Sequence, residues 1–280
     1  MSGAAFQASD TLKNSHSKDC FKVLKSKPFR KVILSGNVIE VYEYELAPFM
    51  GGHRQYEEHD SLDWVDELED EIDRKLDELP AEVQHMLAVT QGRLPQNITR
   101  TRNMVRRLIL ANFDNNSRFI TFTFRENIQD VQEANKLWKK FIQRLRRKYG
   151  GFKYIAVVEF QKRGAVHYHM LSDIPFVKAS EMERIWGNGF IKINKITHVD
   201  NVGAYVIKYM TKDLTDIRLF ANKAYNCSMG LERPVVLRGE LAEEIIRMYD
   251  LETKKIVFAN SYISEHLGQI RYSEYNLKRL

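Results

Sequence analysis

The sequence is poor in cysteine and has no long apolar run. Its only cysteines, Cys20 and Cys227, are far apart and form no closely spaced pair, which argues against a disulfide framework and a cysteine-based zinc site. Apolar runs such as residues 154–158 and 108–111 are far shorter than the ~20 residues that a membrane-spanning helix needs. The first ten residues show no charged segment followed by an apolar one, so no secretory signal is visible. We therefore expect a cytoplasmic protein with no membrane partner.

Proline and glycine are also modest in number, with 6 and 14 among 280 residues, while 44% of residues are hydrophobic and 29% are charged. This composition excludes a fibrous chain and predicts that most residues fold. The length suits one large domain or two modest ones, because single cores tend to split beyond roughly 250 to 300 residues.

Basic residues outnumber acidic ones by 43 to 37, and their distribution is uneven. The segment 57–78 holds twelve acidic and two basic residues, so the rest of the chain carries a net charge of +16. Basic residues gather in two clusters: Arg93, Arg100, Arg102, Arg106 and Arg107, and Lys136, Lys139, Lys140, Arg144, Arg146, Arg147 and Lys148. Such clusters are typical of a polyanion-binding protein, although solvated helix faces have the same appearance.

Four regions follow from the pattern of apolar, charged and turn-forming residues. Residues 1–19 are expected to form a mobile tail, and residues 20–115 a hairpin and helices with a possible role in DNA recognition. The turn-rich residues 114–117 predict a domain boundary. Residues 116–214 then read as an α+β domain, and residues 215–280 as an α+β extension of unknown role. The expected hairpin turns near residues 35–37, and the acidic segment is expected to form an amphipathic helix from Ser61 to Pro80. Further helices are expected at 98–113, 131–145, 179–186, 202–213 and 240–249, and strands at 118–124, 152–160, 165–171, 190–196 and 255–259.

Two histidines stand two residues apart on an expected strand. Side chains in a strand alternate between faces, so His167 and His169 point the same way and Tyr168 points to the other face. Glu159 lies late in the preceding strand, across a tight turn, where antiparallel pairing brings its carboxylate near both imidazoles. The three side chains predict a metal site with open positions for water and a phosphate oxygen. The same set can hold non-haem iron for oxygen chemistry, and the spacing of the histidines alone can arise by chance.

Two tyrosines four residues apart share one face of the expected helix 202–213. Lys208 lies three residues after Tyr205, on nearly the same side as Tyr205 and Tyr209. Because a free tyrosine has a pKa near ~10, a phenolate nucleophile needs positive charge close by, which a metal and Lys208 can supply. The alternative interpretation is that both tyrosines belong to the core.

Three segments carry a family resemblance: FTF at 122–124, VHYHML at 166–171 and YVIKYMTKD at 205–213. In this order they resemble the motifs of HUH endonucleases, specifically the rolling-circle replication initiator (Rep) proteins of bacterial plasmids and single-stranded DNA phages. The resemblance covers residues 117–214. It implies a ferredoxin-like core with a central antiparallel sheet flanked by helices, and a divalent metal, Mg²⁺ or Mn²⁺. It also implies a tyrosine that nicks one strand of origin DNA, leaving a 5′-phosphotyrosine link and a 3′-hydroxyl primer. His167 and His169 match the metal-ligand pair, Glu159 matches the third ligand, and Tyr205, Lys208 and Tyr209 match the catalytic helix.

Two features depart from parts of the family. Relatives differ in which tyrosine attacks, and this chain has both, which favours a two-tyrosine scheme over a single nucleophile. No phosphate-binding loop of the form GxxxxGK[ST] is visible, so unwinding requires a host helicase, and the 3′-hydroxyl requires a host polymerase. We expect the basic residues from Lys136 to Lys148 to follow the DNA backbone. Alternative functions are a relaxase or an HUH transposase with the same chemistry, a DNA-binding regulator that does not cut, and a metal-dependent oxygenase.

Overall fold

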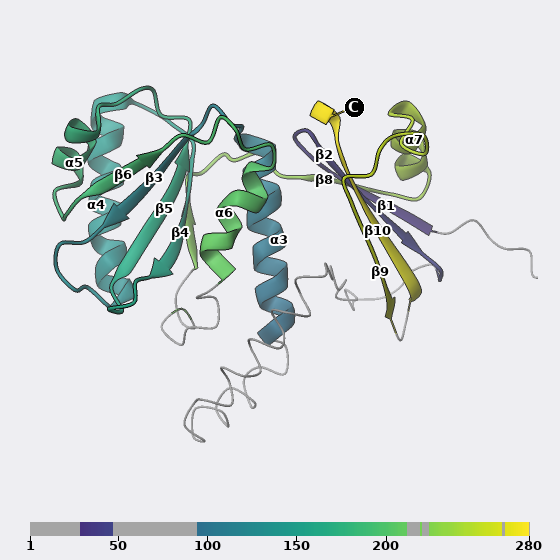
Figure 1. Ribbon diagram of the computed structural model, residues 1–280, viewed down its shortest axis with the longest axis horizontal. Coiled ribbons are helices and arrows are strands. Elements are labelled where there is room, and N and C mark those ends of the chain that lie inside the picture. Colours follow the sequence, from purple (N-terminus) through teal and green to yellow (C-terminus); the bar gives the residue numbers. More distant parts are fainter. Residues whose placement is uncertain (1–28, 47–93, 212–218, 220–223, 265–266, 280) are drawn as a thin grey trace, which may run out of the picture.

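The computed structural model describes residues 29–46, 94–211, 219, 224–264 and 267–279. The expected mobile tail and the expected acidic helix lie outside these residues. In the described part the chain is α+β, as predicted, and forms two five-stranded antiparallel sheets (Figure 1). Two helices, α3 (Leu94–Asn112) and α6 (Val202–Thr211), lie between the sheets.

The first sheet, called the site sheet below, has the strand order β6-β3-β5-β4-β7. Its strands are β3 (Arg118–Thr123), β4 (Tyr154–Phe160), β5 (Val166–Ser172), β6 (Ile191–Asn194) and β7 (Tyr225–Cys227). The strand that carries both histidines, β5, is therefore central. The turn before β5 uses Gly164, whose positive φ of 85° suits glycine.

Each face of the site sheet packs against a different pair of helices. Phe122 and Tyr168 pack against α4 (Val131–Tyr149) and α5 (Ala179–Trp186), whereas Phe119 and Leu171 pack against α3 and α6. Because strand side chains alternate, the odd-numbered residues of β3 and β5 face α3 and α6. This alternation decides which side chains can meet at the histidines.

Helix α4 forms as its apolar spacing predicts. Its buried residues recur every three or four positions, which places them on one face and leaves the basic residues on the others; they are Val131, Ala134, Trp138, Phe141, Ile142 and Leu145. The helix ends at Gly150, which has a φ of 76°. The observed helix extends four residues beyond the expected end at residue 145.

The second sheet has the order β8-β1-β2-β10-β9 and joins the two ends of the described chain. Its strands are β1 (Phe29–Ser35), β2 (Val38–Tyr44), β8 (Val235–Arg238), β9 (Phe258–Ser264) and β10 (Gly268–Asn276), and helix α7 (Glu240–Met248) packs on one face. A short 3-10 helix, η2 (Leu277–Arg279), follows. The expected hairpin is confirmed, because β1 pairs with β2 around a turn at Gly36 and Asn37.

Contacts cross the two expected domain limits, near residues 115 and 214. Helix α3 begins at Leu94 rather than at residue 98 and covers a face of the site sheet, while β7 pairs with β4 at the edge of that sheet. The limits themselves stay a prediction. Strands β7, β8 and β10 were not expected from the sequence, and β9 begins at Phe258 rather than at residue 255.

Two glycines allow close approach to α3. Gly36, with a φ of 58°, sits so near this helix that a Cβ there would lie 2.1 Å from the carbonyl oxygen of Leu110. A Cβ at Gly203 would lie 2.9 Å from the carbonyl oxygen of Arg106. The hairpin turn of the second sheet and the start of α6 therefore both rest directly on the backbone of α3.

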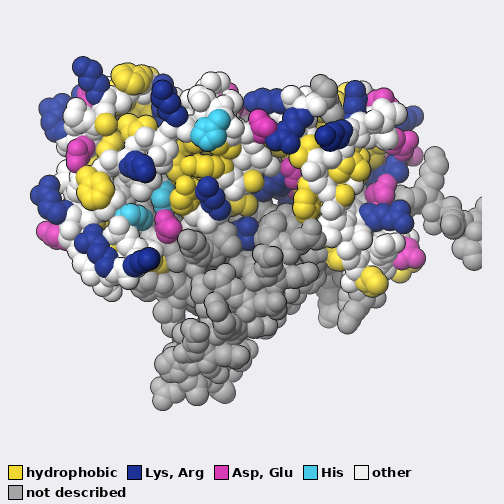
Figure 2. Space-filling view, viewed as in Figure 1, with side chains coloured by type: hydrophobic (Ala, Val, Ile, Leu, Met, Phe, Trp, Pro, Cys, Tyr) yellow, Lys and Arg dark blue, Asp and Glu magenta, His cyan; other side chains and the backbone are white. Residues whose placement is uncertain are grey.

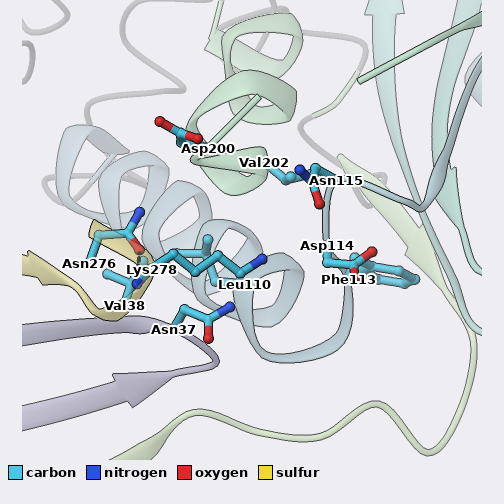
Figure 3. A pocket seen from close by; sticks show the side chains of 10 residues that line it. All are labelled: Asn37, Val38, Leu110, Phe113, Asp114, Asn115, Asp200, Val202, Asn276 and Lys278. Carbon is cyan, nitrogen blue, oxygen red and sulfur yellow. Dashed lines mark hydrogen bonds between the residues drawn. The ribbon is translucent and has the colours of Figure 1, made fainter. Parts of the chain in front are cut away.

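A small hollow marks the place where these elements meet (Figure 3). It is lined from the turn before β2, the end of α3, the start of α6 and the end of β10, by residues that include Asn37, Phe113, Asp200 and Lys278. Its volume of about 20 Å³ is room for a single water molecule, so it is no substrate pocket. Within the described residues, no helix is both long and apolar enough to cross a membrane.

Candidate metal and tyrosine site

Strand register brings the predicted metal ligands together. Glu159 of β4 lies directly opposite His167 of β5, and His169 follows two residues later on the same face. One ligand atom from each of the three side chains lies within 4.8 Å of the others. We call Glu159, His167 and His169 the ligand triad.

The surroundings of the two imidazoles suit metal ligands. His169 is buried, its Nδ1 lies 3.0 Å from Oγ1 of Thr121, and its Nε2 is in contact with the Glu159 carboxylate. The Nε2 atom of His167 is buried with no hydrogen-bond partner in the described part of the chain. Burial, together with neighbouring His169, lowers the pKa of His167 to about 4, which keeps this imidazole in the neutral form that binds metals. Two imidazoles and a carboxylate, one with an unsatisfied buried nitrogen, fit a divalent cation.

Helix α6 places both tyrosines over the triad. The Tyr209 ring stacks on the His169 ring, with centroids 4.3 Å apart, and its hydroxyl lies 3.3 Å from the Tyr205 hydroxyl. Phe119 of β3 supports both phenols, with ring centroids 5.3 Å away in each case. The tyrosines thus pack partly against the core and keep both hydroxyls together beside the triad.

Charge around the phenols works in opposite directions. Burial, the Tyr205 hydroxyl and the Glu159 carboxylate raise the pKa of Tyr209 well above its ordinary value. Lys208 is exposed, and its Nζ lies 4.1 Å from the Tyr205 ring centroid and 5.2 Å from that of Tyr209. A phenolate at this position therefore needs added positive charge, which Lys208 and a cation in the triad are placed to supply.

A buried network connects the start of α6 to the second sheet. The Asn201 side chain accepts a hydrogen bond from the backbone N–H of Ala204 (2.9 Å) and donates one to Glu274 of β10 (3.2 Å). Glu274 also accepts a hydrogen bond from Arg106 of α3 (2.5 Å), and Arg106 contacts Glu40 of β2 at 3.3 Å. Asn201 thereby caps the helix that carries the tyrosines and ties it to the second sheet.

This network uses arginines that the sequence grouped as a basic cluster. Arg102 and Arg106 are buried, and Arg107 pairs with Glu40 at 2.8 Å. Glu40 and Glu274 raise the pKa of Arg106 despite its burial, so the guanidinium stays charged. These three side chains consequently do not present an open basic surface, and sequence reasoning missed their partners because Glu40 and Glu274 lie far away along the chain.

The seven basic residues of α4 are not brought to the triad. They are exposed, but α4 covers the face of the site sheet opposite to the ligand triad. Arg144 donates hydrogen bonds to the carbonyl oxygens of Ile185 and Trp186, both at 2.9 Å, and Lys148 contacts Glu181. Binding of the DNA backbone by α4 stays a prediction, and any DNA that touches both places must pass around an edge of the sheet.

Other side chains of the site were not predicted. Thr121 and Thr123 of β3 lie opposite His169 and His167, and Phe119 supports the tyrosines. The alternation in residues 118–123 contains this signal, but only the register of β3 against β5 reveals it. The face seen in Figure 2 carries histidine side chains beside an acidic one, with Lys and Arg side chains around them.

Comparison with known proteins gives one finding for this region. Residues 117–214, about a third of the chain, match the model of a family described as Replication-associated protein ORF2. The match spans the site sheet from β3 to β6 together with α6, and so includes the ligand triad and both tyrosines. No curated protein and no solved structure matches the chain.

Proposed function

We propose that this chain is an HUH-type replication initiator, which nicks one strand of origin DNA through a tyrosine and later rejoins the strand. The observation that carries the proposal is the stacking of Tyr209 on His169 of the ligand triad, with the Tyr205 hydroxyl 3.3 Å from that of Tyr209. The family match adds support, because a replication-associated family suggests an initiator role for the matched residues.

The arrangement of the site sheet also supports an HUH core. The element order β3-α4-β4-β5-α5-β6, with strand order β6-β3-β5-β4, is that of a split β-α-β ferredoxin-like unit. We infer that α3, β7 and the second sheet are additions to this unit.

Glu159, His167 and His169 would hold the metal, Mg²⁺ or Mn²⁺ in our proposal. When bound, the cation supplies Lewis-acid polarisation of the scissile phosphate and positive charge beside the phenols. Thr121 orients the His169 ring through its Nδ1, as the second hydrogen bond of a metal-binding histidine commonly does. The donor set does not distinguish between the two cations.

The tyrosines carry the covalent chemistry. The attacking phenol loses its proton, its oxygen bonds to phosphorus, and the bond from phosphorus to the 3′ oxygen breaks. The 3′ oxygen takes up a proton, which gives a 3′-hydroxyl and a 5′-phosphotyrosine link. One phosphoester replaces another, so the step needs no ATP. Lys208, over the rings of both tyrosines, stabilises negative charge on the phenol that attacks.

The distance between the hydroxyls favours a two-tyrosine scheme over a single nucleophile. With 3.3 Å between them, both hydroxyls can reach a phosphate held at one place. We assign the first cut to Tyr209, which contacts the triad directly, and strand closure to Tyr205. The partners in this proposal are origin DNA, single-stranded at the nick, a host helicase and a host polymerase.

Formation of a covalent adduct tests the proposal. The full chain is incubated with single-stranded DNA from its own replicon and Mn²⁺, and the products are separated on a denaturing gel. We expect a protein–DNA adduct from the wild type and none from the double variant Tyr205→Phe/Tyr209→Phe. The control is Tyr149→Phe, which removes a hydroxyl from α4 on the other face of the sheet. An adduct from the double variant, or none from any form, would overturn the proposal. Relaxase and transposase functions share this chemistry and are separated from initiation by testing which DNA is cut.

A further inference from the structure

An exposed aromatic residue lies in the same cross-strand row as two members of the ligand triad. The backbone N–H of Thr123 donates a hydrogen bond to the carbonyl oxygen of Phe190 (3.0 Å), which extends the register of β3 and β6 by one residue. Thr123 in turn lies opposite His167, and His167 lies opposite Glu159. The row therefore runs Phe190, Thr123, His167, Glu159 across the site sheet.

Alternation along β6 indicates which way the side chains point. Ile191 and Ile193 pack in the core beneath α4 and α5, so Phe190 and Lys192 belong to the opposite face, which carries the triad. Phe190 is 56% exposed, and Lys192, opposite Thr121 in the next row, is also exposed. With strands about 4.8 Å apart, the backbone of Phe190 lies roughly 10 Å from that of His167.

The loop that carries Phe190 is held firmly against the end of β3. A Cβ at Gly189 would lie 2.2 Å from the carbonyl oxygen of Thr123, so only glycine permits this approach. The backbone N–H of Arg125 donates to the carbonyl oxygen of Asn188 (2.8 Å), and the Trp186 indole donates to that of Thr123 (3.1 Å). An exposed phenyl ring on a fixed backbone loses little conformational freedom when a flat partner binds to it.

We propose that Phe190 is a stacking platform for a base of single-stranded DNA, close to the scissile phosphate, and that Lys192 contacts a neighbouring phosphate. An aromatic ring flanked by positive charge is the usual means of holding single-stranded nucleic acid. Exposed Arg125 and Arg163 add charge of the same sign near the end of the row, where Arg163 acts electrostatically on His167. The inference rests on the proposed function, and it supplies a DNA contact on the face of the triad, which α4 does not.

Binding of a fluorescein-labelled oligothymidylate of about 15 nucleotides, measured by anisotropy in EDTA, tests the platform because stacking tolerates any base. We expect Phe190→Ala and Phe190→Leu to weaken binding about 10-fold and Phe190→Trp to bind within about 2-fold of the wild type. The matched control is Phe176→Ala. Phe176 is 75% exposed and follows the other end of β5, away from the triad. Lys192→Gln should flatten the salt dependence of log Kd by about 0.7.

A second measurement reports contact rather than stability. Oligothymidylate should quench the added tryptophan fluorescence of Phe190→Trp but not that of Phe176→Trp. The platform is overturned if the wild type does not bind, if Phe190→Ala and Phe190→Leu bind as the wild type does, if Phe176→Ala weakens binding equally, or if position 190 shows no quenching. Retained Phe190 effects without any covalent adduct in Mn²⁺ would instead remove the nicking proposal and leave the platform standing.

Discussion

Removing the charge of Glu274 should loosen the connection between the second sheet and the helix that carries the tyrosines. Glu274 is 5% exposed and joins Arg106 of α3 to Asn201 at the start of α6. The variant Glu274→Gln keeps the shape of the side chain and removes the ion pair. Breaking a buried pair by changing one partner typically costs about 3 to 5 kcal/mol. We expect the lower end, about 3 kcal/mol, because Arg106 keeps Glu40 at 3.3 Å.

The assay is thermal unfolding followed by circular dichroism. For a chain of this size 1 kcal/mol corresponds to roughly 2 to 4 °C, so Tm should fall by about 6 to 12 °C. The matched control is Glu232→Gln, which removes an exposed pair with Lys153 (3.0 Å) and should cost less than about 1 kcal/mol. If Glu274→Gln melted at the temperature of the wild type, or no lower than Glu232→Gln, the network would not stabilise the junction.

The same variant should slow nicking more than it weakens DNA binding. Asn201 caps α6, and a weakened cap typically costs about 1 kcal/mol of helix stability, which places the phenols less firmly over His169. A rate measured well below Tm, at saturating DNA, separates this effect from unfolding. An unchanged rate would show that the second sheet does not position the tyrosines.

Three further predictions concern the triad, the junction and the DNA surface. His167→Ala or His169→Ala should abolish nicking in Mn²⁺ while most DNA binding remains, because the charged groups that hold the backbone lie elsewhere; metal-dependent nicking that survived would remove the triad as the site. Gly36→Ala should lower the free energy of unfolding by more than about 1 kcal/mol in chemical denaturation, because φ is 58° and the new methyl group would meet Leu110; a neutral effect would contradict the close packing on α3. Neutralising Arg146 and Arg147 should reduce the salt slope of log Kd by about 2 for long origin duplex, yet leave it unchanged for an oligonucleotide of about 15 bases; an unchanged slope for both would mean that α4 faces away from DNA.

Local pattern predicted most of the site, because its parts lie within short stretches of sequence. Two histidines on one face of a strand, and a glutamate across a tight turn, need only period-two alternation and antiparallel pairing. The helix with Tyr205 and Tyr209 needs only four-residue spacing. The structure brings these parts together at the positions that the register requires.

Long-range pairing was beyond the reach of the same reasoning. Strand β10 pairs with β2 across more than two hundred residues, and the short β7 and β8 carry too few residues for a periodic signal. The basic pattern of residues 100–107 also gave no sign that Arg106 is buried against Glu40 and Glu274. Charge on a helix shows its partners only after the fold has placed them.

Identification of the residue that becomes linked to DNA tests the central claim most directly. The wild-type adduct formed in Mn²⁺ is digested, and the peptide that carries the 5′-phosphate is sequenced by mass spectrometry. We predict a phosphotyrosine in α6, at Tyr209 for the first cut, because its ring stacks on His169. A link at Tyr205 would reverse the order of the two phenols and leave the site intact. A link to a residue outside α6, or cut DNA without any covalent link, would contradict the account.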